Sequence, residues 1–368
     1  MKGSLAVWYE PLHIGDVKGR PPEVELHFNL WRDLNIEVNF FDVGILFKDV
    51  QDLKEFSFFL PIELELSDIE DLFPKMSEGE TLNAVFNDVV EIMRNDGSHI
   101  ITTTRNGPFH TLHRVEPIAD FTLKAINIDS ERRGAVVVLS REFCQRIRGM
   151  PGDHYIRLRF RLEKKKGELF SSYFAPEDAP LLSSFGLIEI TEFRLNERRS
   201  YPKAIVSLSN AGSPRLSAIH YFLVRDLRYE LVASHTDFRK VRRLEADLWQ
   251  HYINDLPANA GNRMVIYHWK ADGKDGKGIE DFVALANFRV PQPNLPIYLV
   301  LLLVFGALGG VLQDSMVAGF QGLFGLFSAE DNEVPSTLLA GAILLGAAFF
   351  VLKSKAVQSR LRKLTSGV

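Results

Sequence analysis

The chain has 368 residues, of which 46% are hydrophobic and 24% are charged. This length suggests two domains, or one large domain with additions, and the composition excludes a disordered chain, a coiled coil or a fibre. Lysine and arginine (43) nearly balance aspartate and glutamate (47), so the net charge of −4 excludes a general attraction to nucleic acid. The single cysteine, Cys144, cannot form an internal disulfide, which fits a reducing compartment.

Residues 1–294 contain many short segments in which apolar and polar side chains alternate, the pattern of half-buried β-strands. Turn-forming sequences such as Asn106-Gly107-Pro108 separate these segments. Because helices are few, we predict a mainly β (α+β) region of sandwich or barrel type. The predicted strands are Ile36–Phe40, Ile62–Leu66, Ile100–Thr104, Phe121–Ile128, Ala135–Leu139, Ile156–Leu162, Leu187–Leu195, Ala218–Val224, Met264–Trp269 and Phe282–Phe288.

Three helices are predicted in the same region: Asp68–Phe73, Arg141–Ile147 and the longer Phe238–Ile253. A stretch rich in lysine, serine and proline between Lys164 and Pro180 suggests a domain boundary. We therefore expect one β-rich domain over residues 1–168 and a second over 169–294, with the long helix (238–253) in the second.

Two basic segments are candidate anion sites. In the strand Ile156–Leu162, arginines alternate with apolar residues, so three guanidinium groups share one face and repel each other unless acids or a bound anion neutralise them. At the start of the predicted helix 238–253, arginines crowd an end whose free N–H groups attract phosphate. The alternative interpretation is surface pairing with neighbouring acids. The candidate ligand-binding residues are Arg157, Arg159, Arg161, Arg239, Arg242 and Arg243.

Catalytic motifs are absent from the sequence, which contains no GxxxxGK[ST], GxSxG or HExxH. His110 and His113 are three residues apart, and on a strand this odd spacing points them to opposite faces, which disfavours a shared metal. Cys144 is expected to be a small buried residue rather than a nucleophile. We therefore predict a protein that is not an enzyme and that has no metal or cofactor.

Two uncharged apolar runs follow, over residues 295–312 and 334–352. As helices, both are long enough to cross a hydrocarbon core of about 30 Å, so we predict a transmembrane hairpin over residues 295–352. The tail 353–368 is basic and the connection between the runs is acidic. The positive-inside rule then places both termini in the cytoplasm, and the predicted location is the inner (cytoplasmic) membrane, crossed twice.

Small residues give each apolar run a face that allows close helix packing, at Gly306 and Gly310 and at Ala342 and Gly346. These faces pack either within one hairpin or between chains, so a homo-oligomer is expected. The connection is rich in phenylalanine and glycine, and it is either an interfacial helix or a re-entrant element that perturbs the bilayer. Its apolar face consists of Phe320, Leu323, Phe324 and Phe327.

This order of parts, a large β-rich cytoplasmic region before a short membrane hairpin, resembles the two-transmembrane-helix effectors of prokaryotic anti-phage defence systems. The resemblance covers the layout and the apolar C-terminal segment. It implies a pore-forming sensor-effector: the cytoplasmic region binds an anionic ligand, such as a nucleotide, or a partner protein encoded nearby, and the oligomerised hairpin disrupts the lipid bilayer. The alternatives are a membrane-tethered scaffold or regulator that uses the hairpin only as an anchor, and a membrane-associated hydrolase without a recognisable motif.

Overall fold

The computed structural model describes residues 3–13, 20–33, 38–162, 169–174, 186–249, 251–253, 261–274, 276–291 and 295–325. Two compact units make up the chain. The first consists of residues 1–174 and 188–290, and it holds the β-sheets. The second consists of residues 175–187 and 291–368, and its described helix is α6 (Leu295–Gly325).

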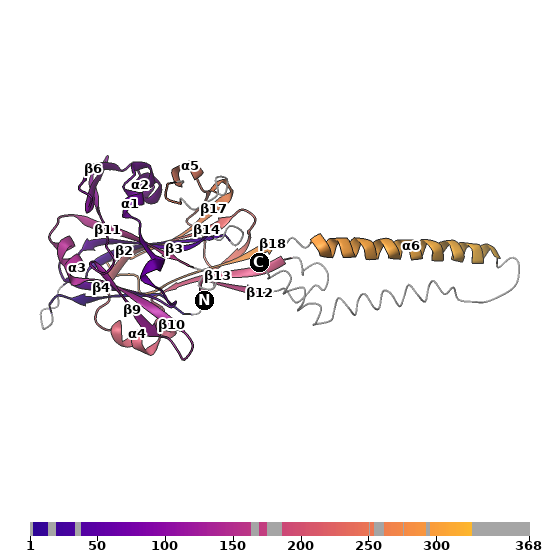
Figure 1. Cartoon of the computed structure of the whole chain (residues 1–368), viewed down its shortest axis with the longest axis horizontal. Helices are drawn as coiled ribbons and strands as arrows, with labels where there is room; N and C mark the ends of the chain where they lie inside the picture. Colours follow the sequence, from indigo (N-terminus) through magenta and orange to yellow (C-terminus); the bar gives the residue numbers. More distant parts are fainter. Residues whose placement is uncertain are drawn as a thin grey trace. The chain divides into compact units, whose positions relative to one another are not determined.

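The first unit contains three sheets, so this part of the chain is mainly β, as the sequence predicts (Figure 1). Two of the sheets are four-stranded. One has the order β1 (Ala6–Pro11), β4 (Leu53–Leu60), β10 (Arg133–Leu139) and β9 (Phe121–Asn127). The other has the order β12 (Ser171–Phe174), β13 (Gly186–Leu195), β18 (Phe282–Pro291) and β15 (Glu230–Ser234).

The third sheet is ten-stranded and forms the centre of the unit. A short strand, β5 (Ile69–Asp71), pairs with β11 outside the main path. Along the main path the order is β16 (Lys240–Arg243), β17 (Met264–Asp272), β14 (Arg215–Asp226), β2 (Glu23–Asp33), β3 (Val38–Asp49), β11 (Asp153–Arg161), β8 (Gly107–His113), β7 (His99–Thr104) and β6 (Glu91–Asn95).

One apolar core joins the large sheet to both smaller sheets. In β2, Leu26 and Phe28 belong to this core, and the intervening His27 points to the opposite face because side chains alternate along a strand. The Phe28 ring stacks on Phe41 of β3 with 5.7 Å between centroids, and it lies 4.9 Å from Phe193 of β13. The apolar face of the large sheet is therefore packed against the two smaller sheets, whereas its other face carries polar side chains such as His27.

Short helices cover that other face (Figure 1). They are α1 (Phe73–Met76), α2 (Gly79–Phe86) and α5 (Ala246–Trp249), which pack through two further apolar clusters. On other surfaces, α3 (Arg141–Arg148) contacts β4, and Ile205 of α4 (Lys203–Leu208) packs with Trp8 of β1. The 3₁₀ turns are η1 (Leu66–Asp68), η4 (Arg198–Ser200) and η5 (Gly261–Arg263).

Most predicted strands are confirmed, but two elements near residue 65 were predicted wrongly. Ile62–Leu66 forms no strand; Ile62 and Leu64 are both buried in the core. Asp68–Phe73 is not a helix, because residues Ile69–Asp71 pair as β5 with β11. Pairing with a distant strand thus outweighed the local pattern there.

The long helix predicted over Phe238–Ile253 is also wrong. Lys240–Arg243 is strand β16, whose backbone completes the edge of the large sheet against β17, and only Ala246–Trp249 is helical. In this segment Leu244 and Tyr252 are buried, whereas Val241 is 48% exposed. The arginines therefore stand on a sheet edge, and the expected helix N-terminus is not there.

Strands from both sides of the expected boundary near residue 168 share the large sheet. β2 pairs in parallel with β14, with His27 opposite His220. Residues 163–168 themselves lie outside the described residues.

The C-terminal predictions fall only partly on described residues. Helix α6 covers the first apolar run and extends through Phe320, Leu323 and Phe324. Phe327, Ala342, Gly346, the second run (334–352) and the tail (353–368) lie outside the described residues. Among the described residues, no helix is both long and apolar enough to cross a membrane.

A buried ion pair anchors the segment after α5 to the large sheet. Asp42 of β3 accepts hydrogen bonds from Arg159 Nε (2.7 Å), from Trp31 Nε1 (2.9 Å) and from the Tyr252 hydroxyl (2.6 Å). Asp42 and Arg159 are both 0% exposed, and the Arg159 guanidinium lies 3.8 Å from the Phe40 ring centroid. The Asp42 carboxylate and the Arg159 guanidinium thus neutralise each other inside the fold.

Replacing Asp42 with Asn should destabilise the fold, because it leaves the Arg159 charge buried without a counter-charge. We expect a loss of about 3–5 kcal/mol in the free energy of unfolding. Chemical denaturation of the full-length chain, followed by tryptophan fluorescence, measures it. Arg161→Ser is the control: this arginine is 50% exposed, and its loss should change stability by less than about 0.5 kcal/mol. Equal stability of D42N and the unsubstituted chain would contradict the assignment.

Candidate functional site

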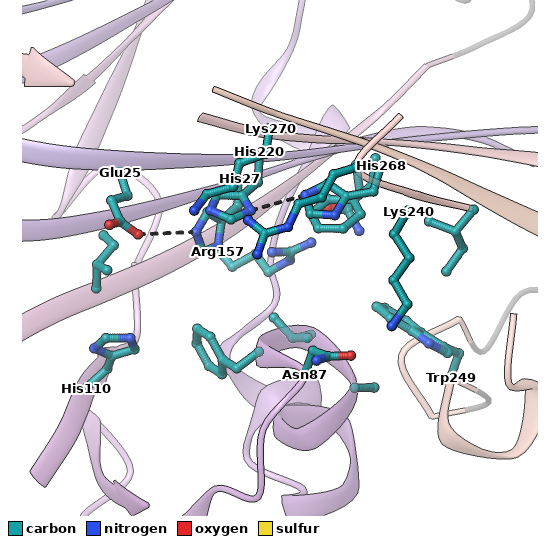
Figure 2. A pocket seen from close by; sticks show the side chains of 18 of the residues that line it. Glu25, His27, Asn87, His110, Arg157, His220, Lys240, Trp249, His268 and Lys270 are labelled. Atoms are coloured by element: carbon teal, nitrogen blue, oxygen red, sulfur yellow. Dashed lines mark hydrogen bonds and ion pairs between the residues drawn. The ribbon is translucent and has the colours of Figure 1, made fainter. Parts of the chain in front are cut away.

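A cavity of about 580 Å³ lies on the polar face of the large sheet, with residues of α2 and α5 also in its wall (Figure 2). The register of the strands explains its floor. His27 of β2 lies opposite His220 of β14, and His220 lies opposite Lys270 of β17. In the next row, Phe222 lies opposite His268, which lies opposite Lys240 of β16. Strand alternation points these side chains to the same face.

Residues from other elements close the cavity. In Figure 2, His110, Asn87 and Trp249 lie across from the cluster of His27, His220, His268 and Lys270. Asn87 ends α2 in the left-handed conformation (φ 54°), which asparagine tolerates better than most residues.

Positive charge dominates the lining. Its basic side chains include Arg157, Arg239, Lys240 and Lys270, whereas the acids among its described lining residues are Glu25 and Asp153. Within the described part of the chain, Arg157, Arg239 and Lys240 form no ion pair. A cavity with such an excess of unpaired cations attracts anions.

Arg157 is held in place by hydroxyl groups. Its Nε donates to the Tyr252 hydroxyl (2.6 Å) and its Nη1 to the Tyr155 hydroxyl (2.7 Å), and the residue is only 3% exposed. Gly44 of β3 lies opposite both His27 and Arg157 in the sheet, and a Cβ at this position would overlap the Tyr155 hydroxyl. The guanidinium is therefore fixed at the cavity wall. Among the described residues it forms no direct ion pair, and the Asp42 carboxylate lies behind the Tyr252 hydroxyl.

The histidines of the cavity are neutral at pH 7. Burial, which disfavours the charged imidazolium, lowers the pKa of His110 to about 4, of His220 to about 3 and of His268 to about 4. Burial is also the main reason that the pKa of His27 is lowered. Neutral imidazoles supply hydrogen-bond and metal-binding nitrogens rather than additional charge.

Three lining residues carry buried polar atoms without a hydrogen-bond partner among the described residues: Asn29 Oδ1, His110 Nδ1 and Trp249 Nε1. Buried polar atoms are nearly always satisfied, so these three atoms are able to accept a hydrogen bond from a bound molecule or donate one to it. Aromatic rings, including those of Phe86 and Phe109, supply flat apolar surface beside them. The cavity thus combines cations, unpaired polar groups and rings.

The six predicted arginines separate into two groups. Arg157, Arg239 and Arg242 line this one cavity. Of these three, Arg242 also forms an ion pair with Glu245 (3.0 Å), which is the surface pairing of the alternative interpretation. The other three predicted arginines are engaged elsewhere: Arg159 with Asp42, Arg161 with Glu70 (2.8 Å) and Arg243 with the carbonyl of Asn262 (2.7 Å). On β11, Arg159 and Arg161 thus pair with acids, as the alternative interpretation has it, and of the three arginines only Arg161 is exposed.

Sequence reasoning missed Glu25, His27, Asn29, His220 and His268. A signal was available on β2, where the sequence EVELHFNL alternates strictly between polar and apolar residues. Histidine and asparagine on the polar face of such a strand indicate a functional surface. The parallel pairing of β2 with β14, which completes the site, has no local signal.

Comparison with models of known protein families gives no match for this chain, and comparison with curated protein sequences gives none either.

Acid should weaken the fold through these histidines. A pKa of about 4 for His110 in the folded chain, against about 6.5 when unfolded, means that the unfolded chain binds more protons between these values. Stability should therefore fall as the pH is lowered from 6.5 to 4.5, and His110 should account for on the order of 2 kcal/mol of that fall.

Thermal denaturation of the full-length chain between pH 7 and 4.5 measures this dependence. His110→Gln should flatten it, whereas the same change at the exposed His235 should not. Burial raises the pKa of Asp71 to about 6, so Asp71 stabilises the fold as the pH falls. This contribution is the same in the variants and in the unsubstituted chain, and it therefore cancels when their slopes are compared. An unchanged slope in H110Q would argue against a neutral buried His110.

Proposed function

We propose that the first unit is a sensor that binds an organic anion of the nucleotide class in the cavity. The observation that carries this proposal is the gathering of basic side chains around one cavity, three of which (Arg157, Arg239 and Lys240) form no ion pair among the described residues. Phosphate groups suit the guanidinium and ammonium groups, because charge-assisted hydrogen bonds are the strongest available to them. An aromatic base suits the rings and the unpaired amide and indole groups.

The cations lie on two sides of the space. Arg157 is fixed on β11, whereas Arg239, Lys240 and Arg242 come from the β16 segment at the edge of the sheet. Trp249 shares the wall with Lys240 (Figure 2). This arrangement supports binding of a ligand with more than one anionic group, which two separated sets of donors hold better than one.

Arg239 and Arg242 line the cavity and should both contribute to binding, Arg242 by exchanging its ion pair with Glu245 for the ligand. Arg243 is the matched control because it is not among the lining residues and donates to the Asn262 carbonyl. Calorimetry with ATP, GTP and pyrophosphate tests the full-length chain. The double variant R239A/R242A should bind at least tenfold more weakly, since each lost charge-assisted hydrogen bond costs about 1.5–3 kcal/mol. R243A should bind as the unsubstituted chain does. Failure of all three probes to bind, or an equal loss in R243A, would contradict the nucleotide-class ligand.

We further propose that ligand binding controls an effector action of the apolar C-terminal segment on the inner membrane, with both termini cytoplasmic and several chains assembling. The support is the uncharged run 295–312, the resemblance in layout to two-transmembrane-helix anti-phage effectors, and the exposed side chains of α6, such as Leu302 and Leu303 at 71%. The competing proposals remain a membrane-tethered scaffold and a membrane-associated hydrolase.

Small residues on α6 should mediate the assembly. A Cβ built on Gly306 or Gly310 meets no other atom within 4 Å in the described part of the chain, so leucine fits there without a clash. G306L/G310L should therefore retain membrane localisation but lose depolarisation, because close backbone packing drives association in lipid.

Membrane potential and growth of expressing cells provide the measurement. Deleting residues 295–368 should abolish toxicity if the segment is the effector. A full-length chain that reaches the membrane, binds ligand and leaves the potential unchanged would favour the scaffold instead.

A further inference from the structure

We propose that Glu25, His27 and His220 form a binding site for a divalent transition-metal ion, of the kind that zinc occupies, in the wall of the cavity. One ligand atom from each residue lies within 4.8 Å of the others. The placement follows from the sheet. Glu25 and His27 are two residues apart on β2 and share its polar face, and the parallel register puts His220 of β14 directly opposite His27.

Each of the three side chains is oriented by a second partner. Lys48 Nζ contacts Glu25 Oε1, the Tyr155 hydroxyl lies 3.4 Å from His27 Nδ1, and His268 Nε2 lies 3.2 Å from His220 Nδ1. These contacts leave Glu25 Oε2 and both Nε2 atoms for an ion. Glu25 Oε2 and His27 Nε2 are already 3.9 Å apart (Figure 2). Metal-binding histidines are commonly oriented in this way through their other ring nitrogen.

The donor set selects the class of ion. Two imidazoles and one carboxylate suit zinc and neighbouring first-row metals, whereas magnesium and calcium prefer oxygen ligands. Tetrahedral bonds of about 2.0–2.2 Å separate ligand atoms by roughly 3.3–3.6 Å, so modest side-chain rotations close the site. All three residues line the cavity, which leaves the remaining position open to it. An anionic oxygen of the cavity ligand would complete the coordination, and this last point alone rests on the proposed function.

The test uses the purified full-length chain after chelator treatment, with ZnCl₂ or CoCl₂ as the only added probe. Calorimetry should show one Zn²⁺ per chain, and Co²⁺ should give visible absorption bands of a site with nitrogen and oxygen ligands. His27→Gln and His220→Gln should abolish the stoichiometric binding. His268→Gln should weaken it by about 10- to 100-fold, because it removes only an orienting partner.

Two controls separate this proposal from the anion site. His235→Gln, an exposed histidine outside the cluster, should bind zinc normally, and R239A/R242A should keep zinc binding while losing ATP or pyrophosphate. The cobalt spectrum of the unsubstituted chain makes the test independent of whether any variant folds. No stoichiometric zinc and no cobalt bands in that chain would overturn the metal site, even if ATP binds. Equal loss in H235Q would also overturn it.

Discussion

The parallel pairing of β2 with β14 is the constraint on which the cavity depends. It brings two segments nearly two hundred positions apart into register, so that His27 meets His220 and Asn29 meets Phe222. On the opposite face, the same two strands contribute Phe28 and Tyr221 to the main core. A slip of one residue would exchange the faces, placing histidines among the phenylalanines. The burial of the core therefore fixes the geometry of the polar face.

Charge inside this unit is arranged by the same sheet. Arg159 and Asp42 are opposite each other in the register and neutralise each other out of contact with solvent. A second buried pair, Arg225 of β14 and Glu189 of β13 (2.8 Å), links the large sheet to a smaller one. Arg157 differs from both arginines, since only tyrosine hydroxyls hold it. Arg159 and Arg225 thus form direct ion pairs inside the fold, whereas Arg157 is hydrogen-bonded to neutral hydroxyl groups at the cavity wall.

Alternation of side chains predicted the mainly β character and most strands, because that signal is local and survives in each segment. The clustering of arginines also indicated Arg157, Arg239 and Arg242 as candidate anion-binding residues, because clustered positive charges require neutralisation. It could not show that Asp42 already neutralises Arg159, because this contact joins strands more than one hundred residues apart. Nor could it show that Lys240–Arg243 is an edge strand. A short amphipathic segment fits both the helical and the strand pattern of apolar residues, and only the partner strand decides between them.

Because β16 lies at the end of the large sheet, its pairing with β17 is open to the influence of a bound anion. This strand has four residues, is paired on one side by β17 alone, and carries Lys240 and Arg242 on the face that lines the cavity. Arg242 is ion-paired with Glu245 (3.0 Å). An anion that binds only when β16 is paired with β17 would stabilise that pairing by thermodynamic linkage, by an amount set by its concentration relative to its affinity. Occupancy of the proposed anion site would thereby be linked to the order of a sheet margin.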